Sequence, residues 1–221
     1  QISSPQAEPL VEFVKQSAGV ELPIMTTEPA NDDRVSIYIG QSRAEDGERH
    51  INLLAEMNEH GFIIDVQEDN ITLIGKTDRA TEFAGYDFLE RDVGVRWLMP
   101  GPDGVHVPQH SSILIPQNLV IEEPATISRH FFGMNGNANQ EWYKYNRFHH
   151  NIQFHHNMNN LFDPEVFADH PEYYSGGVVP TVQHFWQPCF NDDTAAAAID
   201  RIIEYFDENP EASSYSLGIN D

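Results

Sequence analysis

The chain has 221 residues, with 35 acidic against 12 basic side chains and a formal net charge of −23. Binding to a phosphate backbone or an anionic lipid surface needs clustered Lys and Arg, so this composition argues against nucleic-acid and anionic-membrane partners. No stretch approaches the roughly 18 apolar residues of a membrane span. The one cysteine, Cys189, excludes both an internal disulfide framework and a Cys-based zinc site.

The first half of the chain alternates helical and extended hydrophobic patterns. Apolar residues at helical spacing predict helices over residues 5–18, 51–60 and 78–90. Short apolar or alternating runs predict strands over residues 21–26, 35–39, 62–66 and 71–75, with the last two joined as a hairpin, and strand pieces within residues 105–120. We therefore expect a small N-terminal α/β domain with a mixed sheet over residues 1–124.

Beyond residue 124 the pattern changes to a strand, a polar tip and then a helix. Strands are predicted over residues 128–134, 150–155, 184–189 and 215–219. A helix is predicted over residues 193–207, with inward apolar residues Ala195, Ala198, Ile199, Ile202, Ile203 and Phe206. Strand, helix and strand in this order predict parallel pairing, which when repeated builds a (β/α)8 TIM barrel. A complete barrel needs roughly 200 residues or more, so residues 125–221 are expected to hold a truncated first half of one.

Residues 142–189 concentrate polar and aromatic side chains, including six of the eleven histidines. A segment that only filled a core would be richer in Leu, Val and Ile, because buried polar groups without partners cost free energy. This density is typical of a cleft for a polar, ring-shaped ligand. The predicted substrate-binding residues are Trp142, Asn146, Arg147, His149, His150, His155, His156, His170, Glu172, Trp186 and Gln187.

Polar residues also follow the predicted strands, at the barrel end where ligands bind. They lie at residues 135–137, 155–157, 187–191 and 220–221. Asp221 is the predicted catalytic carboxylate, acting as a general acid or base or orienting a substrate group, and Asn220 would hydrogen-bond a sugar hydroxyl or acetamido group. The alternative is that the Asn residues are ordinary turns and that Asp221 caps a helix.

Several of these side chains have a plainer interpretation. Trp142 and Trp186 suit stacking on a sugar ring and equally suit a core position. Arg147 is either an anchor for a substrate oxygen or one half of an ion pair. The pairs His149–His150 and His155–His156 lack further ligands that would complete a zinc shell, so neither a metal nor another cofactor is expected.

Four strings together resemble a known family: FAGYDFLERDVGVRWLMPG at residues 83–101, HPEYYS at 170–175, QPCFND at 187–192 and SLGIND at 216–221. They resemble the bacterial domain-of-unknown-function family 4838, part of which is grouped as glycoside hydrolase family 163. The resemblance implies an N-terminal domain similar to those of family 20 hexosaminidases and family 67 α-glucuronidases, followed by the first half of a barrel.

The same resemblance implies endo-β-N-acetylglucosaminidase activity on N-glycans. It matches site residues to the family motifs at His170, Glu172, Gln187, Cys189, Asn220 and Asp221. The chain departs from the family pattern at Pro188 and at residues 176–178, so the resemblance does not specify the sugar.

These observations predict a secreted or periplasmic bacterial glycoside hydrolase with a carbohydrate substrate. One alternative is a non-catalytic glycan-binding protein that keeps the cleft. Another is an α-glucuronidase-like hydrolase of acidic polysaccharide. A metal-dependent hydrolase that uses the paired histidines is the weakest of the readings. The oligomeric state does not follow from the sequence.

Overall fold

The computed structural model describes residues 6–26, 34–126, 128–130, 136–149, 152–181 and 188–219. Its contacts divide the chain into two units, Gln1–Phe148 and His149–Asp221. Each unit is considered by itself below. No helix among the described residues is long and apolar enough to cross a membrane.

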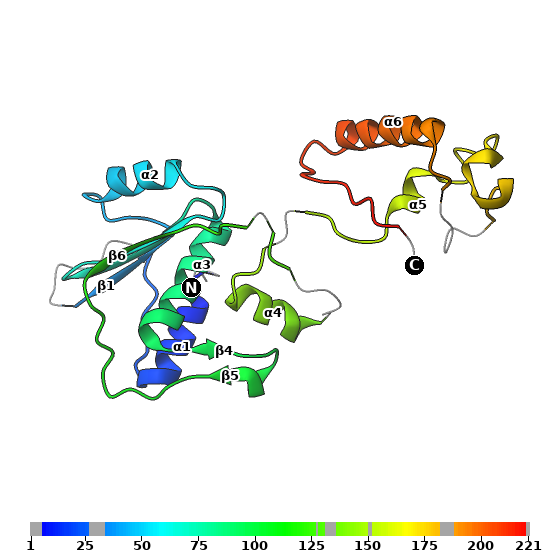
Figure 1. Ribbon diagram of the computed structural model, residues 1–221. Helices are drawn as coiled ribbons and strands as arrows, with labels where there is room; N and C mark the ends of the chain where they lie inside the picture. Colours follow the sequence, from blue (N-terminus) through cyan, green and yellow to red (C-terminus); the bar gives the residue numbers. More distant parts are fainter. Residues whose placement is uncertain are drawn as a thin grey trace. The chain divides into compact units, whose positions relative to one another are not determined.

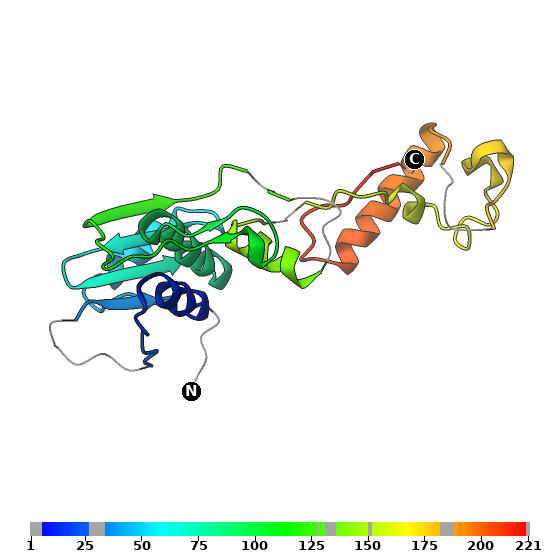
Figure 2. The same cartoon turned by 90° about the horizontal axis from the view of Figure 1, so that it is seen from below.

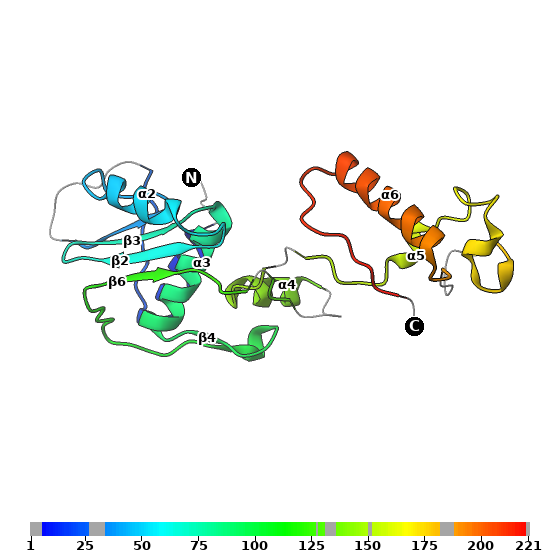
Figure 3. The same ribbon diagram turned by 45° about the horizontal axis from the view of Figure 1, so that its top comes forward.

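The first unit is built on a four-stranded mixed sheet with the order β1-β3-β2-β6. Its strands are β1 (Ser36–Ile39), β2 (Phe62–Val66), β3 (Asn70–Gly75) and β6 (Asn118–Glu122). β1 runs parallel to β3, whereas β2 is antiparallel to both β3 and β6 (Figure 3). The predicted hairpin and the mixed α/β character are confirmed.

Helices cover both faces of this sheet. α1 (Glu8–Ala18) and α3 (Asp78–Phe88), which continues into a π turn over Leu89–Val93, lie on one face (Figures 1 and 2). α2 (Gly47–Ala55) lies on the other face (Figure 1). Every residue of β2 is buried because it contacts both layers: Ile64 joins the core with α1 and α3, and Ile63 packs against Leu54 and Met57.

Two backbone approaches fix the layers closely. A Cβ added to Gly75 would lie 2.3 Å from the backbone of Ala80, so only glycine allows β3 to pass this close to α3. Lys76 Nζ donates hydrogen bonds to the carbonyl oxygens of Ala55 and Met57, at the end of α2. These carbonyls have no intrahelical partner, so the lysine ties the last turn of α2 to the end of β3.

A smaller layer completes the first unit. β4 (Arg96–Trp97) pairs antiparallel with β5 (Val105–His106) across a 3₁₀ turn at Pro102–Gly104. α4 (Asn137–Tyr145) packs Trp142 and Tyr145 against the main core. The first unit consequently extends beyond residue 124. The domain boundary predicted at residue 124 stays a prediction, because contacts that define a compact unit do not test where a domain ends.

The second unit has its own small core of Leu161, Phe162 and Tyr174. Its helices are α5 (Met158–Leu161), two 3₁₀ turns at Pro171–Tyr173 and Ser175–Gly177, and α6 (Asp192–Glu208). Its described residues form two isolated β-bridges, a parallel one between His156 and Gly218 and an antiparallel one between Tyr174 and Pro188. They contain no closed barrel.

Several predicted elements need correction. Residues 21–26 form no strand: Pro23 has no N–H to donate to a ladder, and Ile24 and Met25 are exposed. The helix predicted over residues 51–60 begins at Gly47 and ends at Ala55. The predicted strands at 128–134, 150–155 and 184–189 fall partly outside the described residues, and their described parts form only isolated bridges or coil.

The buried face of α6 also differs from the prediction. Ala198 and Ile202 pack against the core of the second unit, as predicted, together with Ala197. Ile199 and Ile203, which were expected to face inward, are exposed. The inward side of α6 also carries Arg201 and Tyr205, which line a polar hollow described below. Apolar residues therefore do not occupy the whole of that side.

Candidate functional site

Two chain segments of the second unit lie side by side in parallel, residues 153–157 and 214–218. His155 N–H donates to Ser216 Oγ (3.0 Å), and Gln153 N–H donates to Ser214 Oγ (2.7 Å). Asn157 N–H donates to the Gly218 carbonyl (3.0 Å). The buried Ser216 hydroxyl donates back to the His155 carbonyl, so side-chain oxygens replace part of an ordinary ladder. The helix α6 lies between the two segments in sequence.

This alignment depends on a glycine. A Cβ added to Gly218 would lie 2.4 Å from the His155 carbonyl oxygen and 3.0 Å from its carbon. No side chain fits at that distance without moving the backbone of one segment. The glycine of the SLGIND string therefore has a packing role that sequence reasoning did not identify.

A hollow of about 370 Å³ lies over one face of the alignment. Gln153, His155 and Asn157 contribute to it from every second position of the first segment, as side chains on one face of an extended strand do. Gln153 Nε2 donates to the Tyr205 hydroxyl at 2.7 Å. The complete lining is Gln153, His155, Asn157, Asn160, Leu161, Arg201, Glu204, Tyr205, Glu208 and Tyr215.

Sequence reasoning missed the helical side of this hollow. Arg201, Glu204, Tyr205 and Glu208 recur at spacings of three and four, and so share one face of α6. The spacing of these polar residues is visible in the sequence, but the prediction for this helix considered only its apolar residues. The hollow therefore contains carboxylates, a guanidinium, an imidazole and amides at close quarters.

His156 faces away from the hollow and contacts the end of the second segment. Its Nδ1 forms a short contact with the Ile219 carbonyl oxygen. Exposed apolar side chains share this opposite face at alternate positions, Phe154 on the first segment and Leu217 and Ile219 on the second. The predicted catalytic residues Asn220 and Asp221, which follow Ile219 directly, lie outside the described residues, as do His150, Trp186 and Gln187.

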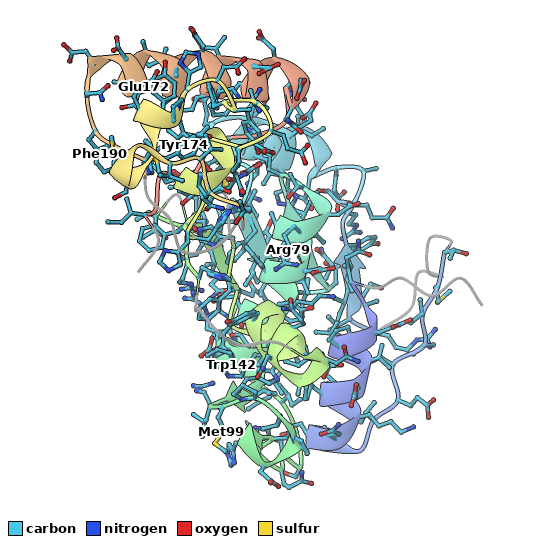
Figure 4. All side chains as sticks on the ribbon, turned by 90° about the vertical axis from the view of Figure 1, so that its right-hand side faces the viewer. Arg79, Met99, Trp142, Glu172, Tyr174 and Phe190 are labelled. Atoms are coloured by element: carbon cyan, nitrogen blue, oxygen red, sulfur yellow. The ribbon has the colours of Figure 1, made fainter. Side chains whose placement is uncertain are left out.

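His170 and Glu172 form a separate exposed pair in the segment between α5 and α6. His170 Nδ1 lies 2.8 Å from Glu172 Oε1, and this hydrogen bond lowers the pKa of the Glu172 carboxyl. The His170 ring stacks on Tyr173 with 4.7 Å between ring centroids. Figure 4 labels Glu172 beside Tyr174 of the same turn. Neither His170 nor Glu172 lines the hollow, so the structure does not bring this pair together with His155.

Trp142, Asn146 and Arg147 belong to the first unit. Trp142 Nε1 (2.9 Å) and Asn146 Nδ2 (3.1 Å) both donate to the Trp97 carbonyl. Arg147, in the left-handed region at φ 57°, donates to Glu90 Oε2 at 2.5 Å. The ion-pair interpretation of Arg147 thus has a definite partner. His149, the first residue of the second unit, is buried.

A second hollow of about 550 Å³ lies in the first unit, and its lining includes Trp142 and Met99, both labelled in Figure 4. Its apolar wall includes Phe13, Trp97, Trp142 and Tyr145, and Trp97 stacks on Tyr145 with 4.9 Å between ring centroids. Glu12, Gln16 and Glu141 supply polar atoms to the same hollow. Of the predicted site residues, Trp142 alone lines this hollow.

Among the described residues, no group of three or more His, Cys, Asp or Glu side chains has the arrangement of a metal site. The two hollows contain side-chain acids, amides, a guanidinium, an imidazole and aromatic faces.

Comparison with known proteins identifies one family. Residues 99–221 match the model of a family described as Domain of unknown function (DUF4838). No curated protein and no solved structure matches the chain. The match covers α4, both segments of the parallel alignment and α6.

Proposed function

The chain belongs to the DUF4838 family, and from this premise we propose that it is a carbohydrate-active protein, a glycoside hydrolase acting on glycans. The observation that carries the proposal is the parallel alignment of residues 153–157 with residues 214–218. In parallel α/β folds, ligands bind beyond the carboxyl ends of neighbouring strands. The first segment ends in polar residues, His155 to Asn157, and Asn220 and Asp221 follow the second segment in the sequence.

We further propose that the second unit forms part of a (β/α)8 barrel. The position of α6 between the two segments in sequence supports this, because parallel neighbours in a barrel are joined by a helix. The exposed side chains of Phe154, Leu217 and Ile219 support it as well, since the face of a barrel strand opposite its helix points to a packed interior. In this arrangement residues 158–191 form a long connection between a barrel strand and the helix that follows it.

The proposed catalytic roles follow from side-chain chemistry. Asp221 would serve as the general acid or base, or would orient the acetamido group of a β-linked N-acetylhexosamine, whose oxygen would attack the anomeric carbon. Asn220 would hydrogen-bond that group, and His156, which contacts Ile219, would bind a sugar hydroxyl.

The test is glycan release. The chain is incubated with N-glycoproteins and, separately, with acidic polysaccharides, and released sugars are identified by mass spectrometry. Asp221→Ala is expected to reduce release at least ~100-fold, the usual contribution of a general acid or base. Asp207→Ala, an exposed carboxylate near the end of α6, is the matched control and is expected to keep full activity. Absence of release from both substrate classes by folded protein that carries the complete barrel contradicts a hydrolase.

A glycan-binding role is the second candidate, and the hollow of the first unit favours it. Aromatic faces suit the C–H surface of a pyranose ring, and the carboxylates of Glu12 and Glu141 suit its hydroxyls. Titration with oligosaccharides, followed by tryptophan fluorescence, measures this binding. Glu141→Ala should weaken it, whereas Glu8→Ala, an exposed carboxylate of α1 outside the hollow, should not. Binding without turnover would identify the protein as a lectin-like module.

A further inference from the structure

Three polar side chains of the first unit form a hydrogen-bonded chain outside both hollows. Ser42 Oγ lies 2.7 Å from His50 Nδ1, and His50 Nε2 lies 2.9 Å from Asp65 Oδ2. Ser42 comes from the turn after β1, His50 from α2 and Asp65 from β2. A hydroxyl, an imidazole and a carboxylate in this order are the components of a serine nucleophile activated by a base.

The hydrogen-bond partners of Asp65 determine which atom donates in each hydrogen bond of the Ser42–His50–Asp65 series. Asp65 Oδ2 also accepts from Arg49 Nη1 and from Gln67 Nε2, both at 3.1 Å. An oxygen that accepts three hydrogen bonds carries no proton itself, so His50 Nε2 carries the proton that lies between them. His50 Nδ1 is then an acceptor, and the Ser42 hydroxyl donates to it.

The three hydrogen-bonded residues differ in burial in the way that a serine nucleophile and its base require. His50 and Asp65 are buried, whereas Ser42 is only partly buried. The imidazole and the carboxylate are thereby shielded from water, and Ser42 is more accessible than either. The Ser42 hydroxyl also gives the second ring nitrogen of the buried His50 the hydrogen-bond partner that a buried polar atom needs.

Ser42 lies in a connection between a strand and a helix. Residues 40–46 connect strand β1 to helix α2. Serine nucleophiles of α/β hydrolases also lie between a strand and a helix, on a sharp, strained turn. Within residues 40–46, Gly40, at φ 71°, takes the left-handed conformation, and Ser42 does not.

We propose that Ser42, His50 and Asp65 form an acyl-transfer site that takes short-chain esters. Ser42 Oγ attacks the ester carbonyl carbon while its proton passes to His50 Nδ1, and the leaving alcohol takes that proton as the C–O bond breaks. Water then attacks the acyl-serine, with His50 again accepting a proton and returning it to Ser42. Ser42 lines neither hollow, so a short acyl ester is the substrate chosen for the test. The site is independent of the glycan chemistry proposed for the second unit.

The test uses a fluorophosphonate probe and p-nitrophenyl acetate on the whole chain. The probe is expected to label Ser42 in the tryptic peptide of residues 35–43, and Ser42→Ala should slow acetate release at least ~100-fold. Ser36→Ala is the matched control, because this serine lies in the same peptide and has no histidine partner among the described residues.

The fold of the variant is verified by its thermal melting curve, and Ser42→Ala removes only one part-buried hydrogen bond. Labelling should also disappear in urea, because the relay exists only in the folded chain. Three outcomes overturn the proposal: no labelling of the folded protein, labelling at Ser36, or equal acetate release by Ser42→Ala and the unmodified chain.

Discussion

His156 and Gly218 form a parallel β-bridge, although α6 and a long segment separate them in the chain. The bridge joins the second and fourth of the strands predicted from sequence. Pro188, at the predicted third strand, forms an antiparallel bridge with Tyr174. The segments at residues 153–157 and 214–218 are therefore neighbours in the structure, and α6 lies between them in sequence.

Gly218→Ala should destabilise the second unit. Its Cβ would lie 2.4 Å from the His155 carbonyl oxygen, so one segment must shift, and overpacking of this kind costs about 1–3 kcal/mol. Hydrogen exchange should accelerate at the amides of Asn157 and Met158, which donate to the Gly218 carbonyl.

Gly47→Ala is the control for that variant. Gly47 is a helical residue of α2 with nothing within 4 Å of an added Cβ, so alanine should leave stability unchanged or raise it by up to about 1 kcal/mol. If Gly218→Ala behaved like Gly47→Ala, the parallel alignment would be wrong.

Tyr174→Phe should lower the free energy of unfolding by about 1 kcal/mol, because the Tyr174 hydroxyl donates to the buried Phe162 carbonyl at 3.1 Å. Burial raises the pKa of Tyr174 to about 12, from an ordinary value near 10. Since the folded state holds the phenolic proton more tightly than the unfolded state, its contribution to stability is complete below the ordinary pKa.

The contribution of the Tyr174 phenol to stability is lost as pH rises from about 10 toward 12. Urea unfolding across this range should show a loss of stability that is smaller in Tyr174→Phe than in the unmodified chain. Tyr173→Phe, at the half-buried neighbouring ring, should retain the pH dependence of the unmodified chain. A phenolate absorbance that titrates at the ordinary value for all tyrosines would contradict this prediction.

Asn191→Ala should destabilise α6 by roughly 1 kcal/mol. The Asn191 side chain accepts from the backbone N–H groups of Asp193 and Thr194, and the Asn191 backbone N–H donates to Thr194 Oγ1. Far-ultraviolet circular dichroism during thermal unfolding measures the change. Asn191→Asp keeps an acceptor oxygen and should melt close to the unmodified chain; equal melting of the alanine variant would mean that the cap contributes nothing.

Asp92→Asn should stabilise the first unit. Burial raises the pKa of Asp92, whose Oδ2 has no hydrogen-bond partner among the described residues. Because the folded state favours the protonated acid, ionisation lowers stability as pH rises through and above the ordinary value of about 3.9.

The gain should be less than about 1 kcal/mol, because water reaches and screens the half-buried side chain. It should be present at neutral pH and vanish in acid, which chemical unfolding at both conditions tests. Asp103→Asn, an exposed acid, serves for comparison. A gain that did not depend on pH would implicate packing rather than charge.

The first unit was largely predictable because its signals are local. The runs at residues 62–66 and 71–75 became β2 and β3, and the periodicity at residues 78–90 became α3 with its π turn. The strand predicted at residues 21–26 failed because hydrophobicity alone does not supply a pairing partner, and Pro23 removes a donor.

The second unit was less predictable because its contacts are long-range. Ser214 and Ser216 hydrogen-bond to the backbone of residues 153 and 155. The sequence of neither segment indicates that it pairs with the other. Imidazoles close in sequence separate for the same reason: His155 lines a hollow, and His170 pairs with Glu172 in a different segment. Local density of polar residues identified candidates but did not place them.

The lysine that holds the end of α2 has a practical consequence for measurements on this protein. The chain contains three lysines, Lys15, Lys76 and Lys144, and the ammonium of Lys76 is bound to two backbone carbonyls. Amine-directed biotinylation or dye coupling at lysine should therefore concentrate on Lys15 and Lys144, which are exposed. Because residues 149–221 contain no lysine, a sensor surface prepared in this way would present the second unit chemically unaltered.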